Sequence, residues 1–343
     1  MSHKSISFFA KVKDHEALRR TEFYAQDLSI LAELGYDVKI CLTPRDLRPA
    51  DLYYVWWWTW ACFPVAFART LGRPVIVTGV MDYWKFDDRP AWQQQMMRFA
   101  LKRAHANVFV SELEYQQVPQ HLPTSNPSFC PLIVDTKLYS PGSALREDFV
   151  LTVAWMRDDN AIRKCIPEVV KAAHLIHREH PHIRFVVAGE KESYYPILEQ
   201  MVTELGAKDY ISFPGVISQE EKIDLMRRCK VYLQPSRFEG FGLAILEAMS
   251  CGASIVTSPV GAVPEVVGET ARLVDGTSPE AIAEAVSALL SQEKARVELG
   301  QQARRRAETV FPYERRKRDL QRIIEQVWQG QGNNRRAVAA GKQ

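Results

Sequence analysis

Short apolar runs alternate with longer amphipathic stretches along most of the chain, a pattern typical of β-α-β units and parallel sheets. In the first half the pattern predicts strands at 5–10, 37–42, 52–58, 74–78 and 106–111, and helices at 16–34, 64–71 and 92–106. In the second half it predicts strands at 149–154, 184–188, 210–213, 230–234, 254–257 and 271–274. Helices are expected among them at 165–179, 194–205, 220–229, 242–250, 264–267, 279–290 and 295–308. The sequence therefore predicts an α/β protein with two doubly wound, Rossmann-like halves.

The length of 343 residues agrees with two domains of about 150 residues each. We expect an N-terminal domain over 1–143, a C-terminal domain over 144–312 and a further helix over 313–328. In one interpretation, that helix crosses back to the N-terminal domain. The Gly/Asn/Gln-rich tail at 329–343 is expected to be disordered. Because doubly wound sheets bind ligands at the carboxyl ends of their strands, two such domains are expected to face a central cleft.

Composition excludes several protein classes. Hydrophobic residues make up 46% and charged residues 25% of the chain, close to the average for soluble globular proteins and unlike disordered or fibrous chains. A net charge of +3 is too balanced for a protein held on nucleic acid by phosphate neutralisation, so no nucleic-acid partner is expected. The six cysteines stand singly, which favours buried thiols in a reducing compartment over a disulfide or zinc framework.

Neither a signal peptide nor a membrane span is predicted. The apolar run before Lys11 is too short for a signal peptide, and the uncharged stretch at 52–68 is short for a span and contains Pro64. We therefore expect a cytoplasmic protein. Basic residues outnumber acidic ones at 294–318, and a solvated helix surface is the first interpretation of that segment. The second is peripheral contact with anionic lipid at the inner membrane face, or with an acidic acceptor, through Arg304, Arg305, Arg306, Arg315, Arg316, Lys317 and Arg318.

The segment 231–256 carries the most specific chemistry. It is predicted to form a buried strand, a loop with Gly240 and Gly242, and a helix that ends before Gly252. Glycines let the backbone approach a ligand closely, and free N–H groups at a helix start suit a phosphate. Glu239 lies in the loop, and Glu247 lies about 7–8 Å further along the helix. Each carboxylate can accept hydrogen bonds from two hydroxyls, although such a pair by itself is more simply a helix-start charge and a solvated glutamate.

The surrounding motifs resemble a known family. Residues 239–252 resemble the Glu-x7-Glu region of the family 4 retaining glycosyltransferases, which have the GT-B fold, and 259–267 resemble the loop that follows it. Residues 185–190 and 211–218 resemble two further family strands, and 133–141 resemble the connector that ends the N-terminal domain. The resemblance is ordered over 130–310 and only general over 1–120.

This resemblance implies a hexosyltransferase-type enzyme that moves a sugar, with retention, from a nucleotide-diphosphate sugar to an acceptor hydroxyl. The acceptor would be a polysaccharide, a glycolipid or a related glycoside, and no metal or other cofactor would be required. Glu239 would contact the donor sugar as a catalytic residue and Glu247 the ribose. Gly240, Phe241, Gly242 and Leu243 would face the diphosphate and sugar, and the base would lie near Val216.

The resemblance also suggests which cations stabilise the departing diphosphate. Lys164 matches a family lysine that follows the first strand of the C-terminal domain, and it is the second expected catalytic residue. Trp155 stands where the family often has an arginine. Either Arg157 or Arg163 would replace that arginine, and a solvated loop charge is the equally open interpretation of both.

The N-terminal half offers weaker candidates. Asp82 occupies the region of a family histidine and is a candidate acceptor contact, although a capping carboxylate is the simpler interpretation. Trp56, Trp58 and Trp60 would share one face of an extended segment. Trp58 is the candidate from this group for stacking on an acceptor sugar, while core packing is expected for at least two of the three.

Two alternatives to sugar transfer stay open. One is a GT-B epimerase or phosphorylase, and the other is a nucleotide-sugar-binding protein without turnover. His174, His177 and His180 have helical spacing but no nearby carboxylate in the sequence, so a solvated helix end is expected there in place of a metal site.

Overall fold

The computed structural model describes residues 4–340, with side chains described up to residue 330. The chain forms two compact units, one made of Met1–Leu132 with Glu314–Gln343 and the other of Ile133–Tyr313. The 133–141 connector therefore belongs to the second unit, whereas the predicted N-terminal domain extended to residue 143. The reason lies in side-chain anchoring, since Arg227 and Arg304 donate to backbone carbonyls of Leu138, Ser140, Thr136 and Tyr139.

The first unit is built on a six-stranded parallel sheet in the order β2-β1-β3-β4-β5-β6. Its strands are β1 (Ser5–Ala10), β2 (Asp37–Cys41), β3 (Leu52–Trp56), β4 (Val75–Gly79), β5 (Ala106–Phe109) and β6 (Pro127–Phe129). Every residue of β3 and β4 is buried, as expected for central parallel strands covered on both faces. The strand order reverses between β1 and β3, so their carboxyl ends mark the switch point at which doubly wound sheets bind ligands.

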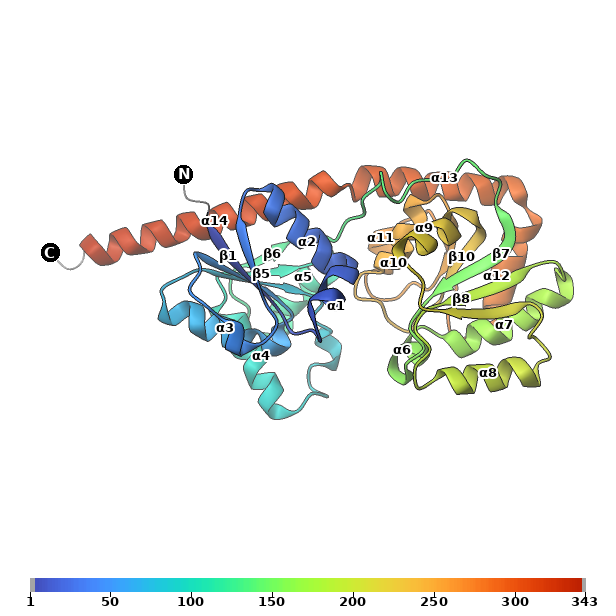
Figure 1. Cartoon of the computed structure of the whole chain (residues 1–343), viewed down its shortest axis with the longest axis horizontal. Helices are drawn as coiled ribbons and strands as arrows, with labels where there is room; N and C mark the ends of the chain where they lie inside the picture. The colour runs from blue at the N-terminus through green and yellow to red at the C-terminus, as the bar shows by residue number, and fades with distance from the viewer. Residues whose placement is uncertain (1–3, 341–343) are drawn as a thin grey trace. The chain divides into compact units, whose positions relative to one another are not determined.

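Helices cover both faces of this sheet (Figure 1). They are α1 (His15–Arg20), α2 (Glu22–Glu33), α3 (Trp58–Thr70), α4 (Ala91–Arg103) and α5 (Glu112–His121), with short 3-10 turns η1 (Pro44–Asp46) and η2 (Tyr83–Lys85). On one face, Tyr53 and Val55 of β3 pack with buried residues of α3 and α4. On the other, Tyr54 and Trp56 donate hydrogen bonds to Asp27 of α2.

The second unit is also built on a six-stranded parallel sheet, in the order β12-β11-β10-β7-β8-β9. Its strands are β7 (Glu147–Val153), β8 (Arg184–Ala188), β9 (Ile211–Gly215), β10 (Cys229–Gln234), β11 (Ser254–Thr257) and β12 (Arg272–Leu273). The order reverses between β7 and β10, which is the nucleotide-binding arrangement of the Rossmann fold. The predicted α/β class with two Rossmann-like sheets is confirmed.

The helices of the second unit are α6 (Asp158–Arg163), α7 (Ile166–Glu179), α8 (Tyr195–Glu204), α9 (Gln219–Arg228), α10 (Leu243–Ser250), α11 (Val263–Val267), α12 (Pro279–Ser291) and α13 (Glu293–Val310). Buried apolar residues of α7, α8 and α12 pack with Val150 of β7 and Leu233 of β10 in one continuous core. The short strand β12 lies beside β11 at one edge of this sheet, and both of its residues are exposed.

Helix α14 (Tyr313–Ala340) returns to the first unit. Leu320, Ile323, Ile324 and Val327 are buried, at the spacing of one helical face. The helix continues to Ala340, and 341–343 lie outside the described residues. Disorder of the tail over 329–343 stays a prediction. Composition suggested disorder there, but Gln, Arg and Ala also extend an existing helix readily.

Two predicted elements of the first unit need correction. The expected helix at 16–34 is interrupted at Thr21, which has extended backbone between α1 and α2. The expected strand at 52–58 ends at Trp56, and α3 begins at Trp58 and includes Pro64. Trp57 makes the turn with a φ of 73°, a left-handed conformation that is strained for a bulky residue. Trp56 and Trp58 therefore do not share the face of one strand.

Candidate functional site

The site begins where β10 ends, at the switch point of the second unit. Gln234 closes the strand, and the chain passes through Glu239 to Gly242, which has a φ of 90° as the N-cap of α10. Gly261 packs so closely on this loop that a Cβ there would lie 2.0 Å from the backbone oxygen of Glu239. Ala262 donates its N–H to the same oxygen at 3.0 Å. The 259–262 segment therefore holds the backbone of Glu239 in place, and only glycine fits at 261.

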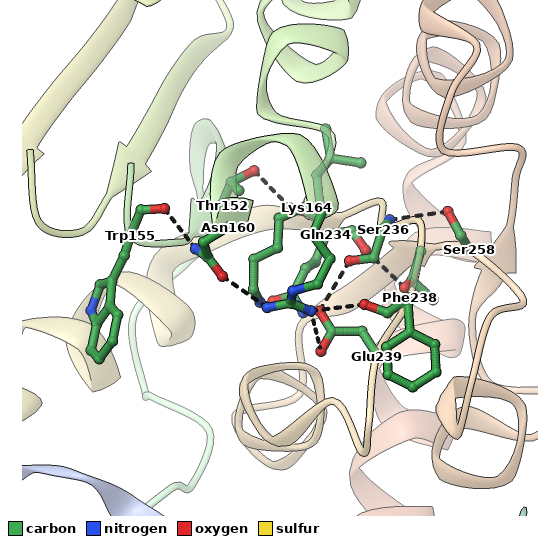
Figure 2. Close-up of polar contacts among 12 residues, drawn as sticks. Thr152, Trp155, Asn160, Lys164, Gln234, Ser236, Phe238, Glu239 and Ser258 are labelled. Carbon is green, nitrogen blue, oxygen red and sulfur yellow. Dashed lines mark hydrogen bonds and ion pairs between the residues drawn. The ribbon is translucent and has the colours of Figure 1, made fainter. Parts of the chain in front are cut away.

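The Glu239 carboxylate is the centre of a polar cluster (Figure 2). Its Oε1 lies 3.2 Å from Lys164 Nζ and its Oε2 lies 3.3 Å from an Arg163 guanidinium nitrogen. Ser236 Oγ and Gln234 Nε2 each donate to Oε1 at 3.0 Å. The carboxylate is 9% exposed and the Lys164 side chain 12% exposed, so both charges lie in a site with little water around them.

Burial and charge act in opposite directions on Glu239. Burial by itself raises the pKa of a carboxyl group, but Lys164 and Arg163 more than offset this, and the pKa of Glu239 lies below its usual value. Burial lowers the pKa of Lys164, and the Glu239 carboxylate works against that shift. Glu239 is thus an ionised hydrogen-bond acceptor at neutral pH, a state that suits contact with sugar hydroxyls.

The structure distinguishes between the two arginines proposed for the cation. Arg163 donates to the carbonyl of Phe238 at 2.7 Å and to Asn160 Oδ1 at 2.8 Å, besides its ion pair with Glu239. Asn160 in turn donates to the carbonyl of Trp155. Arg157 instead pairs with Asp159, and both side chains are more than half exposed. The structure brings Arg163 and Lys164 together at Glu239 and leaves Arg157 in a different contact.

The second glutamate of the motif has its own cation. Glu247 lies on α10 and is 2% exposed. Lys222 Nζ, from α9, donates to both of its carboxylate oxygens at 2.9 Å. The Lys222 ammonium also lies 5.2 Å from the centre of the Tyr139 ring, within cation–π range. Sequence reasoning placed Glu247 correctly on the helix but missed Lys222, because the two residues are 25 positions apart.

The other donor-side candidates lie around the start of α10 and the end of β9. Phe241 is buried and packs edge-on against Phe311 at 5.8 Å. Gly240 and Leu243 are partly exposed beside it. Val216 follows β9 directly and is 57% exposed.

Residues 149–306 match the model of the family described as glycosyl transferases group 1. The chain contains a glycosyl transferases group 1 domain. It is 32% identical over 192 residues to an MMP alpha-(1->4)-mannosyltransferase of Mycolicibacterium hassiacum, covering 54% of this chain and 44% of that protein. It is 25% identical over 232 residues to a subunit of the phosphatidylinositol N-acetylglucosaminyltransferase of Arabidopsis thaliana, covering 65% and 50%. The chain thus spans half or less of the length of these two curated relatives.

Solved structures resemble the whole fold. Sucrose-phosphate synthase from Thermosynechococcus elongatus has a TM-score of 0.81 at 18% identity, covering 96% of this chain and all of that one. Anabaena HepE, solved in complex with UDP and glucose, has a TM-score of 0.78 at 16% identity, covering 94% of this chain and all of that one. At these identities the likeness shows the GT-B fold alone, and the group 1 domain lies within the second unit.

In the first unit, outside the group 1 domain, one acceptor-side prediction is wrong. Trp58 is 1% exposed, donates to Asn107 Oδ1 at 2.8 Å and stacks on Phe109 at 5.2 Å. A side chain that is buried in this way cannot stack on a sugar. The prediction failed because the strand was predicted two residues too long, whereas Trp58 belongs to α3. Asp82 lies after β4 with left-handed backbone and 4.0 Å from Arg89, and its side chain does not cap η2.

Two buried polar residues of the group 1 domain were missed by sequence reasoning. Tyr232 donates its hydroxyl to Gln234 Oε1 at 2.6 Å, and this leaves Gln234 Nε2 to donate to Glu239. Both are fully buried in β10. A polar residue at alternate positions of an otherwise apolar strand was the available signal, since both point to the same side of the sheet.

The predicted basic surface at 294–318 is only partly a surface. Arg316 is 0% exposed, with Nε 2.6 Å from Asp27 Oδ1, so its predicted contact with lipid is wrong. Arg304 and Arg306 donate to backbone carbonyls of Tyr139, Ser250, Glu265 and Val266. Lys317 pairs with Glu33. Arg305 and Arg318 are exposed. Sequence periodicity does not show which arginine side chains donate hydrogen bonds to backbone carbonyls of other elements.

Within 4–340 no helix is long and apolar enough to cross a bilayer. Among the same residues no group of three His, Cys, Asp or Glu side chains is arranged to hold a metal ion. His174 and His177 contact Tyr210, the first through a 2.9 Å hydrogen bond and the second by ring stacking.

Proposed function

We propose that this chain is a retaining glycosyltransferase that transfers a sugar from a nucleotide-diphosphate sugar to an acceptor hydroxyl. The observation that carries the proposal is the ionised Glu239 carboxylate held between Lys164 and Arg163 at the β7/β10 switch point. The group 1 domain and the glycosyltransferase names of its relatives support the same reaction.

Each part of the cluster has a role in this proposal. Glu239 accepts hydrogen bonds from hydroxyls of the donor sugar. The diphosphate lies against the N–H groups at the start of α10, where the helix dipole favours negative charge. Lys164 and Arg163 stabilise the charge that develops on the leaving diphosphate, and cations fixed in a site with little water are effective at this. Retention follows if the acceptor attacks the same face of the sugar from which the diphosphate leaves.

The remaining donor contacts are assigned by position. Val216 is the proposed neighbour of the base, because it is exposed at the carboxyl end of β9. Glu247 is the proposed ribose contact. That contact requires Lys222 to move or to share the carboxylate, because its ammonium engages both oxygens.

For the acceptor, we propose a sugar hydroxyl on a polysaccharide, a glycolipid or a related glycoside. Trp57, in place of Trp58, is the proposed residue for stacking on the acceptor sugar, since it is partly exposed at the carboxyl end of β3. Its indole N–H donates a hydrogen bond to the Tyr24 hydroxyl. A strained backbone at a bulky residue often accompanies a functional position. Asp82, at the carboxyl end of β4, is the proposed second contact.

A thermal-shift panel with UDP, GDP, ADP and their sugars tests donor binding. A nucleotide at one hundred times its Kd stabilises the folded protein by about 2.7 kcal/mol. Release of the nucleoside diphosphate from the sugar that binds then tests turnover. No shift with any nucleotide contradicts the whole proposal. A shift without release above background, with an acceptor mixture present, favours the alternative of a nucleotide-sugar-binding protein without turnover.

A further inference from the structure

A cavity lies in the second unit, away from Glu239. It has a volume of about 330 Å³, large enough for a small ligand. Its lining includes Arg146, directly before β7, and Ser254, the first residue of β11. Both mark the amino ends of the parallel strands, whereas Glu239 follows the carboxyl end of β10. The cavity is therefore at the opposite edge of the sheet from the proposed donor site.

Arginine dominates this cavity. Its lining includes Arg146, Arg296, Arg304 and Arg305, together with Ser254 and Gln301, and none of its lining residues is Asp or Glu. Three of the arginines come from α13, and Arg146 joins them from the segment before β7. The cavity therefore contains three arginines of the basic segment at 294–318.

Backbone carbonyls hold three of these guanidinium groups in place. Arg296 donates to the carbonyls of Leu289 and Leu290 at 3.1 and 3.3 Å. Arg146 donates to the carbonyls of Met226 and Cys229 at 3.2 and 2.7 Å and to that of Cys251 at 2.9 Å. Arg304 donates to carbonyls of the connector and of Ser250. A carbonyl orients a guanidinium group but does not neutralise it, so the positive charge remains.

Nearby carboxylates balance only part of that charge. Glu308 pairs with Arg304 at 2.6 Å. Glu293 lies 3.7 Å from Arg296 and is 83% exposed, so water screens that pair strongly. Asp148, which also interacts electrostatically with Arg296, is paired with Lys230. Arg146 and Arg305 have no carboxylate partner among the described residues.

Two guanidinium groups have nitrogens without a hydrogen-bond partner among the described residues. The Arg296 side chain is 5% exposed, and its Nε is buried without a hydrogen-bond partner. A buried donor left unpaired is unfavourable, and one in a native structure usually has an unseen partner. Arg305 is exposed, and its guanidinium makes no ion pair or hydrogen bond with any residue in the described part of the chain.

We propose that this cavity is a binding site for a phosphate group. Guanidinium forks match phosphate oxygens in geometry and charge, and the four arginines would surround a dianionic ligand from α13 and from the start of β7. The phosphate comes either from an anionic lipid headgroup or from a soluble phosphate ester. The site is independent of the proposed sugar transfer, because its residues do not contact Glu239, Lys164 or Arg163.

Binding is measured by titrating the full chain with inorganic phosphate in a calorimeter and by cosedimentation with phosphatidic acid vesicles, with phosphatidylcholine vesicles as the blank. Arg305→Glu is the test variant, since its exposed side chain has no partner to lose. Arg318→Glu is the matched control, because it makes the same charge change at an exposed arginine outside the cavity. Lys164→Ala separates binding at the proposed donor site from binding here.

We expect Arg305→Glu to weaken binding at least tenfold, while Arg318→Glu and Lys164→Ala leave it within twofold of the wild type. If Arg305→Glu loses binding to inorganic phosphate, with or without a loss of binding to vesicles, the result supports a soluble ester. Loss with vesicles alone supports a lipid headgroup. The proposal is overturned if neither probe binds the wild type, if Arg305→Glu binds normally, or if Arg318→Glu is weakened as much as Arg305→Glu. Neither activity nor the identity of the donor sugar enters these measurements.

Discussion

Replacing Lys164 by methionine removes the cation closest to Glu239 while keeping a side chain of similar length. Arg163 remains 3.3 Å from the other carboxylate oxygen, and Ser236 and Gln234 still donate at 3.0 Å. The carboxylate therefore keeps three of its four neighbours. The variant tests the charge of Lys164 more than the integrity of the cluster.

The structure sets the size of the expected effect. Lys164 is 12% exposed, so solvent screens its charge little. Loss of one preorganised charge-stabilising group from a site of this kind lowers turnover about 10²–10³-fold, or about 2.7–4 kcal/mol. Because the charge on the diphosphate grows as the bond breaks, we expect kcat to fall much further than donor affinity.

The same substitution changes the pH dependence. Lys164 contributes to the low pKa of Glu239, so the pKa of Glu239 rises in the variant. The carboxylate is then protonated sooner as the pH falls, and the acid side of the activity profile moves to higher pH. The stability that the ionised Glu239 contributes is present above the usual glutamate range of about 4.3. In the wild type it is lost only below that range, and in the variant it is lost earlier on acidification.

The assay is release of the nucleoside diphosphate from the donor found in the thermal-shift panel, measured from pH 4 to 8 (~ one point per half unit, enough to resolve a shift of one pKa unit). Lys208→Met is the matched control, since Lys208 is exposed and belongs to no part of the site. Circular dichroism confirms folding of each variant. Turnover of Lys164→Met within threefold of the wild type, with an unmoved acid limb, would refute the assignment of Lys164 to the diphosphate.

Two further predictions concern buried polar groups. Arg316→Met should lower the free energy of unfolding by about 3–5 kcal/mol, because it leaves the Asp27 carboxylate buried without its cation; urea denaturation measures this, and a loss below 1 kcal/mol contradicts it. Tyr232→Phe should cost about 1–3 kcal/mol, because it leaves the buried Gln234 Oε1 without its donor. It should also reduce turnover, since the Gln234 amide is then free to turn away from Glu239, whereas unchanged stability and turnover would contradict that coupling.

Much of the fold and the centre of the site were predictable from local patterns. Strand and helix periodicity depends on neighbours within a few residues, so both sheets were expected, and Glu239 was placed correctly in the loop before a helix. Errors occurred where the local pattern was ambiguous. Apolar residues continue from β3 into α3, so the strand was extended to Trp58, whose side chain is in fact buried against Phe109.

Local sequence patterns were enough to predict two Rossmann-like units, the glutamate loop and the helix that follows it, because hydrophobic periodicity and glycine placement are local properties. Tertiary packing determines which distant charges meet. It chose Arg163 over Arg157 for Glu239, placed Lys222 on Glu247, buried Arg316 against Asp27 and gathered four arginines into one cavity. Such contacts join residues that are distant along the chain, and packing of the whole unit, more than any local preference, brings them within reach.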